Sequence, residues 1–150
     1  MNIRLLNKDE IPPMDLLLLA DPSRKIVEEY VARGACYIAE SDKHVIGVYV
    51  LLPTRPETVE LVNVAVAVEH HGQGIGKRLV MNAIQTARAR GYKTIELGTG
   101  NSSIVQLALY QKCGFRMIGI EGDFFIKHYP EKIFENGIQC RDMIRLSQDL

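Results

Sequence analysis

A glycine-rich segment at residues 71–76 constrains this chain more than any other feature, because it joins a valine-rich run to an amphipathic helix. Residues 58–68 before it alternate as a strand inside a sheet does. After it, apolar residues recur at helical spacing from Ile75 to Ala87, and Gly91 ends the pattern. Glycines permit positive φ and close approach to a ligand, and the first helical turn has unpaired N–H groups. The segment therefore predicts an anion site at the start of a helix.

The charges around this segment favour an anionic ligand. Between His70 and Ile95 the chain has five basic residues and no acidic residue. The formal net charge of the whole chain is zero, so the other residues carry an excess of five negative charges. The balanced total argues against a general nucleic-acid-binding protein. The local excess favours a polyanion, such as a pyrophosphate, near the glycine-rich segment.

Two common phosphate-binding motifs are absent from the segment. A P-loop requires Ser or Thr after Gly-Lys, but Gly76-Lys77 is followed by Arg78. A Rossmann fingerprint requires GxGxxG, whereas Gly72, Gly74 and Gly76 form GxGxG. Nucleotide hydrolysis and hydride transfer are therefore disfavoured. A Gly-x-Gly turn that serves only tight packing, or an unrelated phosphate-binding α/β protein, remains open at this point.

The remainder of the chain predicts one α/β (α+β) domain at residues 1–150. The length is that of one ordinary domain, and no linker or repeat divides it. Apolar patterning predicts strands at residues 2–6, 36–40, 44–52, 58–68, 93–97, 115–121 and 138–146, and helices at residues 9–19, 22–33, 75–91 and 102–113, the last with capping candidates at Asn101, Ser102 and Ser103. We expect an antiparallel meander at the front, ended by Pro53, and a parallel part around residues 58–121.

The cellular setting is predicted from the cysteines and the apolar runs. Three cysteines without CxxC spacing argue against a disulfide scaffold or a zinc knuckle. The longest apolar run, residues 16–20, is far shorter than the ~20 residues that span a bilayer, and the N-terminus lacks a signal-peptide core. We expect a cytoplasmic protein with no membrane partner. We also expect no metal, because His70 and His71 are adjacent and no carboxylate or cysteine lies at ligand spacing.

Two motifs resemble the GNAT superfamily of N-acetyltransferases. The acetyl-CoA loop of that family reads [Q/R]-x-x-G-x-[G/A] after a valine-rich strand, and residues 71–76 read HGQGIG, with His71 in place of Gln or Arg. The family's second block, N...A-x-x-x-Y-x-x-x-G-F, is similar to Asn101 followed by ALYQKCGF at residues 108–115. The resemblance implies a mixed, mainly antiparallel central sheet of about seven strands flanked by about four helices.

The resemblance also implies an N-acetyltransferase that transfers the acetyl group of acetyl-CoA directly to a primary amine in a ternary complex. Backbone groups of the loop would hold the pyrophosphate of this co-substrate. The residues expected to bind acetyl-CoA are Val66, Val68, His71, Gly72, Gln73, Gly74, Ile75, Gly76, Lys77, Asn101 and Tyr110. A covalent acetyl-cysteine route is disfavoured, because Cys113 lies near a helix C-terminus and Cys36 and Cys140 lie in apolar strand patterns.

Tyr110 is the candidate general acid. A leaving thiolate with a pKa of about 8.5 gains from a nearby proton donor. The resemblance places the family's acid at this position, near the sulfur of the co-substrate. A half-buried tyrosine that only fills the gap between helix and sheet is the alternative.

Glu60 is the candidate base, because an alkyl ammonium must lose a proton before it can attack. It lies 14 residues before Gly74, a spacing similar to that of the catalytic Glu in histone-acetylating members of the family. We expect Glu60 to lie amid Val62, Val64 and Val66 on one strand face, where burial would raise its pKa. An edge carboxylate that points into water is the alternative. Glu96 and His128 are the reserve candidates.

No motif identifies the amine acceptor. Residues 121–137 contain several aromatic side chains, which could line an amine pocket, cover a sheet edge or form a homodimer interface. The alternative to an enzyme is a catalytically silent acyl-CoA-binding or partner-binding module of the same fold, since fold does not determine function.

Overall fold

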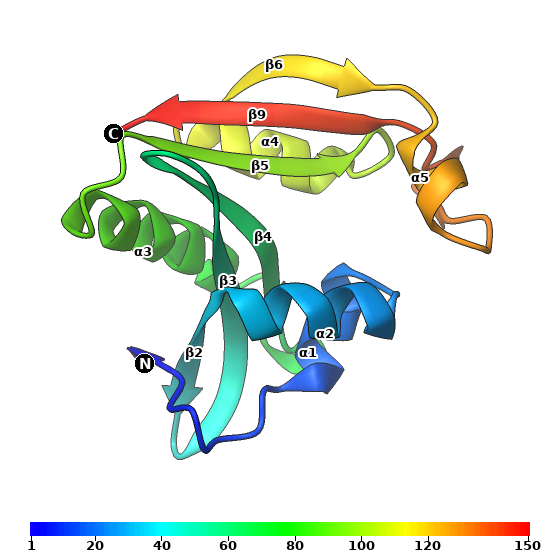
Figure 1. The fold of residues 1–150 in the computed structure, drawn as a ribbon. Helices are drawn as coiled ribbons and strands as arrows, with labels where there is room; N and C mark the ends of the chain where they lie inside the picture. The colour runs from blue at the N-terminus through cyan, green and yellow to red at the C-terminus, as the bar shows by residue number, and fades with distance from the viewer.

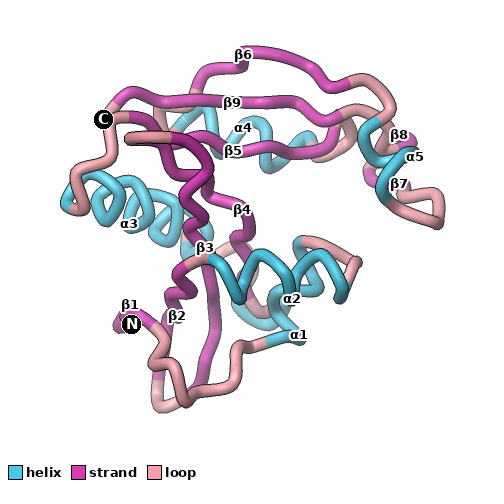
Figure 2. Tube along the Cα trace, viewed as in Figure 1, coloured by secondary structure: helices cyan, strands magenta, loops and turns pink.

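In a computed structural model that describes residues 1–150, helices cover both faces of one seven-stranded sheet (Figure 1). The strand order is β1-β2-β3-β4-β5-β9-β6. The strands are β1 (Asn2–Leu5), β2 (Ala35–Ser41), β3 (His44–Arg55), β4 (Thr58–Val66), β5 (Thr94–Gly100), β6 (Arg116–Glu121) and β9 (Met143–Asp149). The helices are α1 (Met14–Ala20), α2 (Arg24–Arg33), α3 (Ile75–Ala89), α4 (Ile104–Lys112) and α5 (Phe124–His128). The short strands β7 (Phe134–Glu135) and β8 (Ile138–Gln139) form a separate pair near α5 (Figure 2).

The sheet is mixed and mainly antiparallel, which confirms the predicted fold class, and it has five helices rather than about four. Only β4 and β5 are parallel, because the chain crosses from one to the other through α3. The expectation of a longer parallel part at residues 58–121 is wrong. β9 inserts between β5 and β6 and pairs with both in the antiparallel sense.

β4 and β5 are joined only at their N-terminal ends. Their pairing covers Thr58–Glu60 and Thr94–Glu96, although β4 continues to Val66 and β5 to Gly100. Beyond this point β4 is paired with β3 and β5 with β9. Figure 1 shows the two strands diverging. The sheet therefore has two halves that three residue pairs connect.

Two apolar clusters lie on opposite faces of the sheet. Under α3 and α4, the larger cluster contains Leu79, Val80 and Ala83 of α3, all with no exposed surface, and side chains of α4 pack against it. Under α1 and α2, the smaller cluster contains Leu17 and Val27, which are also fully buried. None of the helices is both long and apolar enough to cross a lipid bilayer.

A β-bulge lies in the centre of β4. Val50 of β3 is opposite Asn63 and Leu51 is opposite Leu61, so Val62 has no partner on β3. One extra residue in a strand reverses the alternation of the side chains beyond it. Before the bulge the even-numbered side chains of β4 therefore point to one face of the sheet, and after it they point to the other.

This bulge changes the environment of Glu60. Val64 and Val66 pack against the cluster under α3 and α4, whereas Val62 packs against the cluster under α1 and α2. Glu60 alternates with Val59, which belongs to the α3 cluster, and so it faces the same side as Val62. The expectation that Glu60 shares a face with Val64 and Val66 is wrong, because the extra residue lies between them.

Two predicted strand boundaries are also wrong. β3 continues through Pro53 to Arg55. Its neighbour β2 begins opposite Leu51, so no strand on that side needs the N–H that proline lacks. The strand predicted at residues 138–146 is divided into β8 and β9. The backbone N–H groups of Arg141 and Asp142 donate to the side-chain oxygen of Asn101 at 2.8 and 3.0 Å, and they leave the ladder for this reason.

The polar residues before α4 bond to other segments instead of capping the helix. Ser103 is the N-cap residue, but its side chain accepts no cap hydrogen bond. The hydroxyl groups of Ser102 and Ser103 donate to Glu135 of β7 at 3.2 and 2.9 Å. The start of α4 is therefore tied to the short β7-β8 pair. Helix α5 was not predicted, because its five residues are too few to show a helical pattern of apolar side chains.

Candidate active site

The glycine-rich turn leads from β4 to α3 through two left-handed residues. Gly72 and Gly74 both have φ of 78°, and Gly74 is the N-cap of α3 without a side-chain cap. A Cβ on either glycine would meet no other atom within 4 Å, so backbone conformation rather than crowding requires glycine. The first N–H groups of α3 thus have no side-chain partner on an exposed turn, as an anion site requires.

The side chains of the turn divide into anchors and exposed groups. His71 donates from Nε2 to the carbonyl oxygen of Val66 at 2.8 Å, which ties the turn to the last residue of β4. Ile75 is buried in the α3 cluster, so only its backbone is available to a ligand. Gln73 and Lys77 are exposed beside the start of α3.

Val68 lies outside the strand in which it is predicted. β4 ends at Val66, and Val68–His70 form one turn of 3-10 helix. The side chain of Val68 is exposed. Gly76 lies where α3 passes α4, and a Cβ there would be 3.8 Å from Leu109 and 3.9 Å from Val66, which is ordinary contact.

Tyr110 lies on α4 and packs against the α3 cluster. Its ring meets that of Phe115 edge-on, with centroids 6.3 Å apart. Burial, with a smaller contribution from Cys113, raises the pKa of Tyr110 to about 12. The phenol is therefore protonated at neutral pH and can donate to an anion that reaches this part of α4.

Asn101 organises the connection between β8 and β9. Besides the two hydrogen bonds that its side-chain oxygen accepts, its Nδ2 donates to the carbonyl oxygen of Gln139 at 3.1 Å. The side chain is thus committed to the protein's own backbone. A contact between Asn101 and acetyl-CoA stays a prediction.

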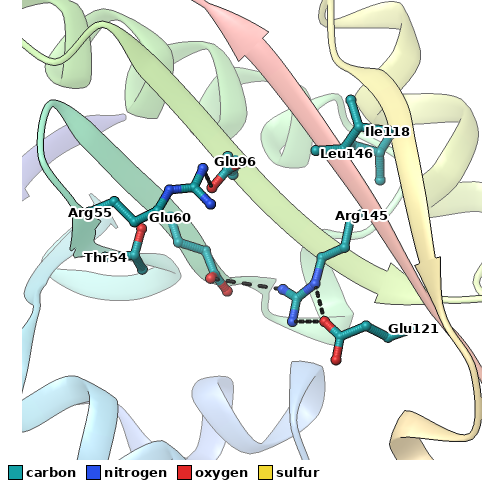
Figure 3. Close-up of a pocket in the computed structure, with 8 residues that line it drawn as sticks. All are labelled: Thr54, Arg55, Glu60, Glu96, Ile118, Glu121, Arg145 and Leu146. Atoms are coloured by element: carbon teal, nitrogen blue, oxygen red, sulfur yellow. Dashed lines mark hydrogen bonds and ion pairs between the residues drawn. The ribbon is translucent and has the colours of Figure 1, made fainter.

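A cavity of about 330 Å³ opens where β4 and β5 diverge (Figure 3). It is lined by Thr54, Arg55, Glu60, Glu96, Ile118, Glu121, Arg145 and Leu146. Glu60 and Glu96 are the last residue pair that joins the two strands. The three carboxylates and two guanidinium groups give this lining one net negative charge, which favours a cationic ligand.

Glu60 is the carboxylate of this cavity that has no close partner. Burial raises the pKa of Glu60, the Arg145 guanidinium opposes that rise, and the charges of Glu96 and Glu121 add to it. The nearest cationic atom, Nη1 of Arg145, is 3.9 Å from Oε1 of Glu60, too far for a hydrogen bond. Glu96 instead accepts a hydrogen bond from Arg55 at 2.8 Å. The lone pairs of Glu60 are therefore available to a ligand.

His128 is not part of this cavity. It is exposed on α5, and its ring lies against Phe124 with centroids 4.5 Å apart. Phe124, on the same helix, lies against a residue of the cavity lining: its ring centroid is 5.8 Å from the guanidinium carbon of Arg145. Of the two reserve candidates, the structure brings only Glu96 to Glu60.

The three cysteines are free and buried. Burial raises the pKa of Cys36 to about 11 and also raises the pKa values of Cys113 and Cys140. All three are therefore thiols at neutral pH, which disfavours a cysteine nucleophile. No group of three metal-binding side chains comes together in the structure.

A polar network on the α1 and α2 face has no sequence signal. Asp21, between α1 and α2, accepts hydrogen bonds from the hydroxyl groups of Tyr30 at 3.2 Å and Tyr129 at 2.9 Å. Asn63 of β4 donates to the hydroxyl oxygen of Tyr30 at 2.8 Å. The network links the two halves of the molecule, and sequence patterns cannot reveal it because Asp21 and Tyr129 are 108 residues apart.

The two faces of the sheet therefore offer different groups to a ligand between the diverging strands. Tyr110, on the α3 and α4 face, is a proton donor. Glu60, on the α1 and α2 face, is a carboxylate with free lone pairs. The anion site lies at the end of β4. This arrangement suits a reaction of an anionic co-substrate that needs one proton donor and one proton acceptor.

Comparisons with known proteins identify the family to which the chain is similar. The family model described as acetyltransferase (GNAT) family matches residues 6–115. The chain is 62% identical over 136 residues to the uncharacterized N-acetyltransferase YvbK of Bacillus subtilis, which covers 91% of this chain and 88% of that protein. It is also similar to a GNAT family acetyltransferase of Elizabethkingia anophelis with acetyl-CoA bound, with a TM-score of 0.97, 46% identity and coverage of 99% and 97% of the two chains. An IAA acetyltransferase of Bacillus cereus matches with a TM-score of 0.95, 56% identity and 99% coverage of both chains.

Proposed function

Because the chain belongs to the acetyltransferase (GNAT) family, we propose that it transfers the acetyl group of acetyl-CoA to a primary amine by direct attack in a ternary complex. The observation that carries this proposal is the pairing of an anion site with a carboxylate cavity at the two ends of the diverging part of β4. The related Elizabethkingia protein has acetyl-CoA bound, which supports acetyl-CoA as the co-substrate.

The turn before α3 is the proposed pyrophosphate site. The N–H groups of residues 74–77 point along the start of the helix, where the helix dipole favours negative charge. Lys77 and Arg78 add positive charge on the exposed side. The rest of acetyl-CoA would follow β4 towards Tyr110 and the cavity, with Val66 as the strand residue nearest to the turn.

Proton transfers balance with one donor and one acceptor. The substrate ammonium first loses one proton to solvent through Glu60. The neutral amine nitrogen then attacks the thioester carbon and gives a second proton to Glu60 directly or through water. When the intermediate collapses, the C–S bond breaks and Tyr110 gives its proton to the leaving thiolate. A proton then returns from Glu60 to Tyr110 through solvent. The products are the N-acetylated amine and free CoA thiol.

The cavity favours a small acceptor that enters as a cation. Its lining has one net negative charge, and its volume of about 330 Å³ is that of a small-ligand site. An ammonium ion that enters as substrate is attracted by Glu60, which then accepts the proton that the amine must lose. Small amines, polyamines and amino sugars are the acceptor classes that fit this charge.

Two measurements test the proposal. Calorimetric titration with acetyl-CoA should give saturable binding, and binding absent at millimolar acetyl-CoA would refute the proposal. A panel of small primary amines, polyamines, amino-sugar antibiotics and peptide N-termini should then be screened for free-thiol release. Binding without thiol release on any amine would instead point to a silent acyl-CoA-binding module.

A further inference from the structure

Arg145 reaches the cavity from a strand that does not touch β4. It lies on β9, and β5 separates β9 from β4 in the sheet. Its register partner on β5 is Gly98. A Cβ at Gly98 would lie closest to the Met143 side chain and 3.0 Å from Nη1 of Arg145, so the glycine leaves space for both side chains.

Two neighbours hold the guanidinium in this position. Nε and Nη2 of Arg145 are 2.8 and 2.7 Å from Oε1 of Glu121 on β6. The ring of Phe124 on α5 stacks against the same group, with 5.8 Å between the guanidinium carbon and the ring centroid. The remaining nitrogen, Nη1, faces Glu60 at 3.9 Å (Figure 3).

We propose that Arg145 is a positioning residue for Glu60, held by Glu121 at a distance where its charge acts on the Glu60 carboxylate without a hydrogen bond that would occupy it. This inference rests on the proposed function, in which Glu60 is the base. If the two groups were closer, the lone pairs of Glu60 would be committed to Arg145. If there were no cation nearby, burial would keep the Glu60 carboxyl group protonated. Because Arg145 is hydrogen-bonded to Glu121, its charge favours the ionised form of Glu60 while the lone pairs of Glu60 stay free.

The other titratable groups near Glu60 have hydrogen-bond partners of their own. Glu96 on β5 is paired with Arg55 at 2.8 Å, and these two form a separate ion pair at the cavity edge. Tyr30 on α2 faces Glu60 from the helical side and is hydrogen-bonded to Asp21. Arg145 is therefore the cation that the structure places within 4.0 Å of Glu60.

The inference predicts shifts of opposite sign in two variants. In R145Q the opposing cation is lost, so the pKa of Glu60 should rise. In E121Q the guanidinium loses its charged partner and is free to approach Glu60, while the repulsion from Glu121 also disappears, so the pKa should fall. Each shift should be about 1 pH unit, the lower end of the effect of a cation within 4–6 Å.

The experiment is a carboxyl titration of the full chain labelled with ¹³C-glutamate, followed by NMR. E60Q identifies the Glu60 signal by its loss. R145K, which keeps the positive charge, should restore the wild-type titration. R141Q is the matched control, because Arg141 is paired with Asp123 at 3.2 Å outside the cavity, and it should leave Glu60 unchanged. The amide spectrum of each variant reports whether it is folded.

Opposite shifts in R145Q and E121Q, with no shift in R141Q, support the inference. No shift, or shifts of the same sign, overturns it even if E60Q abolishes the acidic limb of kcat/KM and so supports Glu60 as the base. The acidic limb, measured with the best amine from the thiol-release screen, should move with the carboxyl titration. If the carboxyl shifts and the limb does not, Glu60 is not the base, and Arg145 has no positioning role in the reaction.

Discussion

At the scale of single residues, Tyr110 and Glu60 are separated by the sheet and have complementary protonation states. The Tyr110 phenol keeps its proton at neutral pH, because burial raises its pKa to about 12. Burial also raises the pKa of Glu60 and thus strengthens it as a base. The shift of Glu60 is in the direction that its proposed role requires, whereas the raised pKa of Tyr110 makes the phenol a weaker acid.

Tyr110→Phe should lower kcat by roughly 10- to 1,000-fold with little change in acetyl-CoA affinity. The substitution removes the hydroxyl group and keeps the ring that packs on Phe115. Steady-state kinetics and calorimetry measure the two quantities. Unchanged kcat in the variant would assign Tyr110 a packing role only.

Glu60→Gln should lose rate at neutral pH and regain part of it as pH rises, because free amine then becomes abundant. The wild-type acidic limb of kcat/KM should be absent from this variant. A rate deficit that is constant with pH would transfer the role of the base to Glu96 or solvent.

The stability of Glu60→Gln should change in the opposite direction to its activity. A carboxyl group whose pKa is raised in the folded protein costs stability as pH rises through that pKa, because the unfolded chain ionises more easily. Glutamine does not titrate, so the variant should resist urea at pH 7 at least as well as the wild type. A clear loss of stability would identify Glu60 as a structural residue.

At the scale of elements, the turn from β4 to α3 combines a conformational requirement with the proposed pyrophosphate site. Gly74 needs its positive φ, whereas Gly76 is helical and has room for a methyl group. These two glycines, only two positions apart, therefore make a matched pair for mutation.

Gly74→Ala should weaken acetyl-CoA binding while leaving the overall fold intact, and Gly76→Ala should not. A left-handed alanine costs about 1–2 kcal/mol, and relief of that strain would move the N–H groups that bind the pyrophosphate. At Gly76 alanine has ordinary contacts and a better helix propensity by about 1 kcal/mol. Calorimetry with acetyl-CoA and a thermal melt compare the two variants. Equal affinities would place the pyrophosphate elsewhere.

At the scale of the whole molecule, few contacts hold the two halves of the sheet together. The pairing of β4 with β5 is short, and the Tyr129–Asp21 hydrogen bond joins the halves on the α1 and α2 face. Burial and the neighbouring Asp21 charge raise the pKa of Tyr129, so the phenol remains a donor through neutral pH.

Tyr129→Phe should lower the free energy of unfolding by about 1.5–3 kcal/mol, the contribution of a hydrogen bond to a charged group. Tyr92→Phe is the control, because Tyr92 packs on the α3 cluster and its hydroxyl has no hydrogen bond within the protein. Urea unfolding of both variants gives the comparison. If the two substitutions lower the free energy of unfolding equally, the Tyr129–Asp21 hydrogen bond does not stabilise the contact between the two halves of the sheet.

Much of the fold follows from local sequence. The positive φ values of the turn and the amphipathic pattern of α3 are properties of short segments, whereas the mixed, mainly antiparallel sheet was implied by the family resemblance of two motifs. The resemblance also implied acetyl-CoA as the co-substrate. Strand limits were less predictable, since Pro53 is tolerated only because β2 has no residue beside it.

The anion site could be predicted from the sequence alone, because the glycines and the unpaired N–H groups that form it belong to one short segment of the chain. The surroundings of Glu60, in contrast, depend on the tertiary fold. A bulge at Val62 turned the residues beyond it to the other face, and Arg145 reached the site from a strand two positions away in the sheet. Alternation is a local rule, and one inserted residue reverses it. Contacts between distant strands depend on how the whole sheet is ordered, which no short segment encodes.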